Sequence, residues 1–172
     1  MMNYNSLFGE MQFINLKGDT LSLADEKMIE LIVINKDTFY FNEGYLKLVL
    51  NEGKVKLANK KFIRFANRQK LGGFEESSQS SIETYGVLSN QSYLKGLVAN
   101  EVITMVKDSV FYIKDDLNGF KAVNKKTLLD IYPRNEKDLK NYLKEKKVDF
   151  SNEEDIKKLI LYFKTIVPVR PL

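Results

Sequence analysis

The first half of the chain alternates short apolar runs with turn residues, at a spacing of roughly nine residues. The clearest example is FYFNEGYLKLVLNEGKVKLAN, in which the tripeptide Asn-Glu-Gly occurs at 42–44 and again at 51–53. Gly44 and Gly53 can each adopt the positive φ angle of a tight reversal, because glycine has no Cβ atom. The pattern therefore predicts three consecutive antiparallel strands.

More strands are expected on both sides of this segment. Upstream, MIELIVI (28–34) precedes an Asn-Lys-Asp turn, and MQFINLKGDTLSL (11–23) predicts a hairpin around 17–19. Downstream, KFIRFA (61–66) extends the series as a further strand.

The alternation disappears between 71 and 92, where Ser, Gly, Gln and Glu accumulate. This composition predicts a long mobile loop with one strand near 82–88. After it, EVITMVK and SVFYIK are typical of strands, and a turn at 115–119 leads into FKAV.

The last third of the chain changes to a helical period. Apolar residues recur at i, i+3, i+4 and i+7, which predicts amphipathic helices with one buried face. These residues are Leu139, Tyr142 and Leu143, followed by Ile156, Leu159, Ile160 and Phe163. A shorter helix, KKTLLDIY, precedes Pro133. Ser151 and Glu154 predict a capping box at the start of the final helix, because each side chain can satisfy a backbone N–H of the first turn.

Together these patterns predict an α+β protein, in which an antiparallel β-meander curls into a sandwich or partial barrel with two or three C-terminal helices. The 172 residues suit one main domain. We divide it into a β-rich part, 1–123, and a helical segment, 124–172, packed on it or beside it.

The composition excludes several kinds of catalytic and metal-binding site. Cysteine, histidine and tryptophan are absent, so cysteine nucleophiles, cysteine metal clusters and histidine-dependent catalytic triads are excluded. No cofactor or metal is predicted. Ser92 and Lys95 fit the S-x-x-K pattern of some serine hydrolases, but the accompanying motifs are missing. We therefore expect a non-enzymatic protein.

Two acidic groups and the aromatic residues have structural interpretations as well. Asp115 and Asp116 resemble the start of a calcium loop, but a plain hairpin turn explains them better. Glu75-Glu76 lies in the predicted loop, and 153–155 favours a helix N-terminus. The 11 Phe and 9 Tyr residues could form a stacking platform, although most occupy alternating strand positions expected in the core.

The charge distribution singles out one segment. Residues 51–74 carry seven basic side chains and one acidic side chain. The candidate binding residues in this region are Lys60, Phe62, Arg64, Arg68 and Lys70. They could bind a polyanion, either nucleic acid or an acidic polysaccharide. We expect a solvated strand face rather than a binding site, because most basic side chains there face away from the aliphatic ones. Without a recognition motif, nucleic acid is not the favoured partner.

The segment from 125 to 163 is similar to the C-terminal part of a family of uncharacterised exported proteins from Bacteroidetes-type bacteria. A basic pair and a Leu-rich helix ending in proline come first, followed by an aromatic residue and a helix that begins with acidic residues and ends in aromatic ones. The residues that carry the resemblance are Lys125, Lys126, Leu128, Leu129, Pro133, Phe150, Glu154, Asp155, Leu159, Tyr162 and Phe163.

This resemblance implies a secreted or periplasmic protein whose signal peptide has been removed. The alternative is a cytoplasmic protein. No apolar run in the sequence reaches the roughly 20 residues of a transmembrane helix. We expect a non-enzymatic exported or envelope-associated protein that binds or scaffolds an unknown protein or glycan partner in the envelope. The alternative function is polyanion binding through 54–70.

Overall fold

A computed structural model describes residues 2–70 and 101–166 of the chain. These residues form two antiparallel sheets of three and six strands and three α-helices, which confirms the α+β class and the meander. The six-stranded sheet is open, with β4 and β9 at its two ends, so it is not a closed barrel. None of the described helices is long and apolar enough to cross a membrane.

The chain divides into two compact units that do not follow the order of the sequence. One comprises Met1–Ile29 and Lys61–Asp108, and the other comprises Glu30–Lys60 and Ser109–Leu172. Two long strands, β7 and β8, contribute residues to both units. The sequence-based division at 123/124 stays a prediction.

The first unit contains the three-stranded sheet. Its strands are β1 (Met2–Asn5), β2 (Glu10–Ile14) and β3 (Thr20–Ser22), followed by the 3-10 helix η1 (Glu26–Met28). The predicted hairpin between β2 and β3 is confirmed. Its turn contains Gly18 at a φ of 88° and is braced by Asn15, whose side-chain oxygen accepts hydrogen bonds from the backbone N–H groups of Lys17 and Asp19, both at 2.9 Å.

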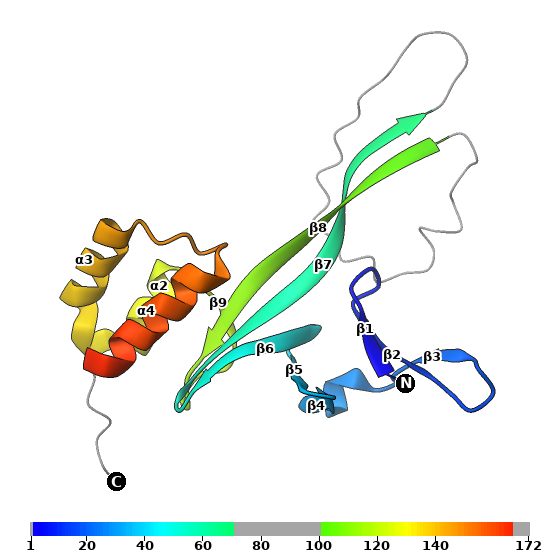
Figure 1. Ribbon diagram of the computed structural model, residues 1–172, viewed down its shortest axis with the longest axis horizontal. Coiled ribbons are helices and arrows are strands. Elements are labelled where there is room, and N and C mark those ends of the chain that lie inside the picture. Colours follow the sequence, from blue (N-terminus) through cyan, green and yellow to red (C-terminus); the bar gives the residue numbers. More distant parts are fainter. Residues whose placement is uncertain (1, 71–100, 167–172) are drawn as a thin grey trace. The chain divides into compact units, whose positions relative to one another are not determined.

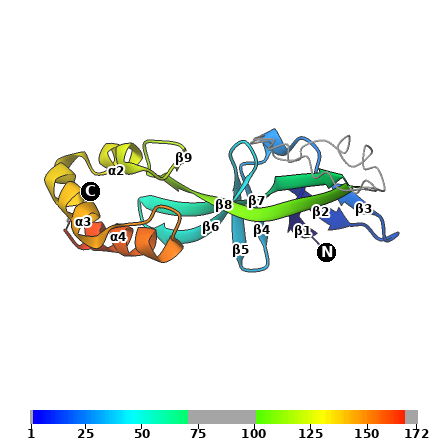
Figure 2. The same cartoon turned by 90° about the horizontal axis from the view of Figure 1, so that it is seen from above.

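The six-stranded sheet follows chain order, so each strand pairs with the next. Its strands are β4 (Leu31–Ile34), β5 (Asp37–Phe41), β6 (Tyr45–Glu52), β7 (Val55–Lys70), β8 (Glu101–Lys114) and β9 (Lys121–Ala122). Both predicted Asn-Glu-Gly reversals are confirmed, with Gly44 at a φ of 113° and Gly53 at 59°. Figure 2 shows β4 and β5 running across the direction of β6.

Two breaks between strands that were expected from the sequence are wrong. KFIRFA is not a separate strand, because it continues β7 without a break, and EVITMVK and SVFYIK together form β8. The joining residues, Asn59 to Lys61 in β7 and Asp108 in β8, include no glycine or proline that would force a turn. The predicted loop at 71–92, with its strand at 82–88, lies outside the described residues.

The predicted helices are all present. They are α2 (Lys125–Ile131), α3 (Glu136–Lys146) and α4 (Glu153–Ile166), with the 3-10 helix η2 (Pro133–Asn135) between the first two. Asn124 caps α2 by accepting a hydrogen bond from the Thr127 N–H at 2.9 Å. Helix α2 stops before Pro133, whose ring disfavours a helical conformation in the preceding residue.

The core of the second unit lies between the helices and the sheet. The three helices lie together beside β9 (Figure 1). The predicted apolar face of α4 is confirmed as buried, because each of its four residues, Ile156, Leu159, Ile160 and Phe163, is at most 1% exposed. They share one cluster with Leu57 of β7, Phe111 and Ile113 of β8, and Leu128, Tyr132 and Leu139 of the helical segment. Burial of this surface holds the helices on the sheet, since isolated helices of this length are marginal in water.

Candidate functional site

The basic candidate residues all lie on β7, but they belong to different compact units. Lys60 is in the second unit, whereas Phe62, Arg64, Arg68 and Lys70 are in the first. The side chains of Arg68 and Lys70 lie outside the described part of the chain.

Lys60 has an acceptor within its own unit. Its Nζ atom donates a hydrogen bond to the backbone carbonyl of Glu43, in the turn between β5 and β6. The same side chain lies over Gly44, where a Cβ atom added to the glycine would lie 3.2 Å from the Lys60 Cε and Nζ atoms. Burial lowers the pKa of Lys60, partly offset by the Glu43 carboxylate. Lys60 thus stabilises the turn between β5 and β6, and its side chain is partly buried.

Arg64 is also paired internally. Its Nε atom lies 2.9 Å from Oδ2 of Asp108, which joins β7 to β8 in the first unit. Phe62, two residues earlier on β7, is half-buried. Both described cations of the candidate set therefore have partners within their own units.

The turn at 115–119 is confirmed as a hairpin turn between β8 and β9. One carboxylate oxygen of Asp115 accepts hydrogen bonds from the backbone N–H groups of Leu117 at 3.0 Å and Asn118 at 2.7 Å. The Asn118 amide also donates to this carboxylate. Asp115 is thus occupied in shaping the turn. Within the described residues, no group of three or more acidic side chains is arranged to hold a metal ion.

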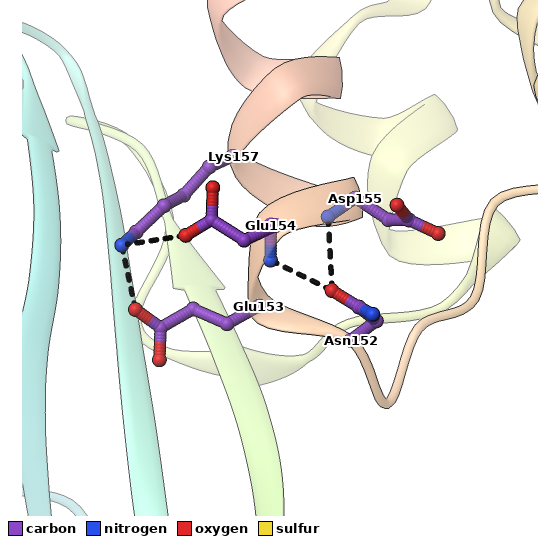
Figure 3. Close-up of polar contacts among 5 residues, drawn as sticks. All are labelled: Asn152, Glu153, Glu154, Asp155 and Lys157. Carbon is purple, nitrogen blue, oxygen red and sulfur yellow. Dashed lines mark hydrogen bonds and ion pairs between the residues drawn. The ribbon is translucent and has the colours of Figure 1, made fainter.

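The acidic start of α4 is a helix cap with a different composition from the predicted one. Asn152, rather than Ser151, caps the helix: its side-chain oxygen accepts hydrogen bonds from the N–H groups of Glu154 at 2.9 Å and Asp155 at 3.3 Å (Figure 3). The predicted Ser151–Glu154 capping box is therefore wrong. The Ser151 hydroxyl instead donates to Asp149 at 2.7 Å, which leaves the next residue to cap the helix.

The neighbouring carboxylates are engaged locally. Lys157, one turn into α4, forms ion pairs with Glu153 at 2.6 Å and Glu154 at 3.5 Å (Figure 3). The hydrogen bond to Glu153 raises the pKa of Lys157. A carboxylate oxygen of Asp155 accepts a hydrogen bond from the Asp149 N–H at 3.1 Å. These contacts stabilise the first turn of the helix rather than forming an acid–base pair.

The aromatic residues of the six-stranded sheet include a group that is covered by the chain itself. Tyr40 of β5 lies 5.2 Å from Phe120, measured between ring centroids. The Lys114 Nζ atom lies over both rings, at 5.4 Å and 5.3 Å from their centroids. A cation placed over a ring face already occupies the surface on which a ligand would stack.

A second aromatic group, not singled out as a site by the sequence pattern, reaches the surface of the helices. The rings of Tyr142 in α3 and Tyr162 in α4 lie 4.6 Å apart and 34° from parallel. Behind them, the buried Phe163 ring contacts Tyr162 at 5.2 Å and Tyr142 at 6.0 Å. In the sequence, Tyr142 belongs to the apolar stripe of its helix and Tyr162 directly precedes Phe163 of the α4 stripe, which places both near the buried faces but does not bring them together.

The tyrosine pair, Tyr142 and Tyr162, combines an accessible ring with nearby polar groups. Tyr162 is 43% exposed and Tyr142 is half-buried. Burial raises the pKa of Tyr142, and the carboxylate of Asp155 and the Tyr162 phenol raise it further. Ile166, one turn beyond Tyr162, adds a partly exposed aliphatic side chain. The pair therefore presents aromatic surface, two phenols and a nearby carboxylate.

Two sequence candidates cannot be placed. Ser92 with Lys95, and the Glu75-Glu76 pair, lie outside the described residues.

Comparison with known proteins finds no matching protein-family model, no matching curated protein and no matching solved structure. The resemblance of the C-terminal segment to exported bacterial proteins stays a prediction.

Proposed function

We propose that this chain is a non-enzymatic binding protein of the bacterial cell envelope or exterior, and that its partner is a glycan held by the tyrosine pair. The envelope location rests on the resemblance of the C-terminal segment to exported proteins. The observation that carries the binding proposal is that Tyr162 is exposed and that its ring lies tilted against the Tyr142 ring.

The chemistry of the pair suits a neutral ligand that is both apolar and polar. A tyrosine combines a large apolar ring with a hydroxyl group, so it can bind through both kinds of contact. Sugar rings present C–H groups on their faces and hydroxyl groups at their edges, which match an aromatic face beside phenols and the Asp155 carboxylate. Phe163 supports both tyrosines from the core, which reduces the side-chain entropy lost on binding.

Binding is favoured over hydrolysis by the roles of the carboxylates at the start of α4. Cleavage of a glycosidic bond generally uses two carboxyl groups that flank the bond, one of them acting as a general acid. Glu153 and Glu154 are paired with Lys157, and Asp155 accepts a backbone hydrogen bond. These three groups support the helix, so we assign the site a binding role.

The alternative, polyanion binding through β7, receives less support. Lys60 donates to the Glu43 carbonyl and Arg64 pairs with Asp108, so binding a polyanion through them would disturb existing contacts. The tyrosine pair needs no such rearrangement. We therefore propose a neutral glycan rather than an acidic polymer.

A glycan array probed with the purified protein and two variants tests the proposal. We expect the wild type to bind a defined set of glycans, and Tyr162→Ala to lose that binding. Leu161→Ala is a matched control, because Leu161 directly precedes Tyr162 on α4 and is 42% exposed, close to the 43% of Tyr162. Absence of glycan binding, or undiminished binding by Tyr162→Ala, would overturn the glycan assignment. Fractionation of cells that express the native gene tests the location separately, and a product confined to the cytosol would contradict it.

A further inference from the structure

Strand β4 is an open edge of the six-stranded sheet. Its four residues, Leu31 to Ile34, are all aliphatic, and within the described residues it pairs only with β5. Leu31 is 45% exposed and Val33 is 60% exposed. Edge strands are normally protected against pairing by charged residues, proline, bulges or covering segments. β4 itself carries no charged residue or proline.

The backbone register shows which groups point away from β5. The Phe41 N–H donates to the Glu30 carbonyl at 3.1 Å, and β4 pairs with β5 through Ile32 with Phe39 and Ile34 with Asp37. Hydrogen-bonded and non-hydrogen-bonded pairs alternate in an antiparallel ladder. The N–H and C=O groups of Leu31 and Val33 must therefore point to the open edge.

We infer that β4 pairs with β4 of a second copy of this chain, antiparallel and about a two-fold axis at Ile32. In this register Leu31 of each copy lies opposite Val33 of the other, so both outward-facing residues of β4 form ladder hydrogen bonds. The two exposed side chains also meet on one face of the joined sheets. A two-fold interface of this kind is self-complementary, because the same strand supplies both halves.

The flanking charges agree with this register. Glu30 of one copy faces Ile34 of the other, and Lys36 lies two residues beyond Ile34, in the turn that follows β4. The symmetry therefore places opposite charges near each end of the joined strands. A shift by one residue would place the outward-facing N–H and C=O groups of one copy opposite residues of the other copy whose N–H and C=O groups point toward β5. A shift by two would bring in Asn35, which has a φ of 57° and lies outside the strand, or Ile29. In the register centred on Ile32, both outward-facing residues of β4 thus form ladder hydrogen bonds, and no residue from outside the strand is needed.

The first test is the oligomeric state by sedimentation equilibrium, over a concentration series that reaches the millimolar range. We expect a monomer–dimer equilibrium for the wild type and a monomer for Val33→Lys, because a charged side chain blunts the edge. Leu117→Lys is the matched control: it adds the same charge at an apolar residue that is 92% exposed in the turn between β8 and β9. This control should show the same monomer–dimer equilibrium as the wild type. A wild type that is monomeric at every concentration, or a Val33→Lys dimer, would overturn the proposal.

The second test reads the register directly. The natural chain contains no cysteine, so Ile32→Cys introduces a single thiol. In the proposed dimer the two copies of residue 32 form a non-hydrogen-bonded pair, with Cα atoms about 4.5 Å apart. A disulfide spans Cα separations of roughly 4.4 to 6.8 Å. We expect mild oxidation to cross-link Ile32→Cys into a dimer and to leave Leu117→Cys mainly monomeric. Equal cross-linking of the two variants would overturn the register.

Discussion

Lys164 of α4 forms an ion pair with Glu52 of β6, 112 positions earlier in the chain. The preceding residue, Phe163, is fully buried in the core of the second unit. Two adjacent residues of one helix therefore contact the rest of the unit in different ways, one through a partly exposed charge and one through apolar burial.

We predict that the buried contact dominates stability. Phe163→Ala should lower the free energy of unfolding by about 3 to 5 kcal/mol, because it removes a buried ring and leaves a cavity. Lys164→Ala should cost only about 0.2 to 1 kcal/mol, as is typical of exposed ion pairs. Urea denaturation followed by circular dichroism measures both values. Equal losses for the two variants would contradict the view that apolar burial holds α4 on the sheet.

The cap of α4 leads to a second prediction. Asn152→Ala should destabilise the protein by about 1 kcal/mol, because two backbone N–H groups lose their acceptor. Ser151→Ala is the matched control and should have a smaller effect, because the Ser151 hydroxyl bonds to Asp149 instead of to the helix. Urea midpoints of the two variants distinguish the assignments. A larger loss for Ser151→Ala would support the capping box expected from the sequence.

Local signals predicted much of the fold. The two Asn-Glu-Gly tripeptides correctly predicted the hairpins that join β5 to β6 and β6 to β7. They could do so because each turn itself requires the positive φ angle of its glycine. The apolar period of α4 likewise identified its buried face. The cap was misplaced by one residue because serine and asparagine are both good caps. In the structure the Ser151 hydroxyl is hydrogen-bonded to Asp149, so asparagine rather than serine caps the helix.

A third prediction concerns alkaline pH. Burial raises the pKa of Tyr132 above its ordinary value of 10.0, with a smaller contribution from the Asp115 carboxylate, and burial raises the pKa of Tyr4 to about 12. A raised folded-state pKa means that the folded protein retains protons that the unfolded chain releases. The stability contribution is therefore complete below pH 10.0 and is lost as the pH rises above it.

Tyr132→Phe separates this effect from other titrations. The variant keeps the ring that packs 5.0 Å from Phe163 but has no phenol to ionise. We expect the wild type to lose more stability than Tyr132→Phe between pH 8 and about 11, measured as the difference in urea midpoint. Parallel pH profiles for the two proteins would show that Tyr132 does not contribute to the alkaline loss.

The basic strand leads to a fourth prediction. Binding to nucleic acid or to an acidic polysaccharide should be weak and should disappear near physiological salt, because such attraction depends on counterion release. Fluorescence anisotropy across a salt series measures it. Submicromolar binding at physiological salt, lost when Lys60, Arg64, Arg68 and Lys70 are changed to Glu with the fold retained, would favour the polyanion function instead.

The candidate site was harder to predict than the fold because its contacts join distant parts of the chain. Lys60 reaches the carbonyl of Glu43 only through the pairing of β6 with β7, which contains an irregularity between Leu48 and Leu50. Arg64 and Asp108 are 44 positions apart. The contact between the Tyr142 and Tyr162 rings depends on how α3 packs against α4, and helical periodicity describes each helix separately.

Nuclear magnetic resonance of the protein with ¹³C-labelled tyrosine rings tests the central claim most directly. The chain contains 9 tyrosines, so each ring can be assigned by substitution. During titration with a glycan that binds on the array, we predict that the ring signals of Tyr142 and Tyr162 shift in a saturable manner, while those of Tyr4 and Tyr40 stay in place. Saturable shifts elsewhere, with Tyr142 and Tyr162 unchanged, would contradict the assignment of the tyrosine pair as the binding site.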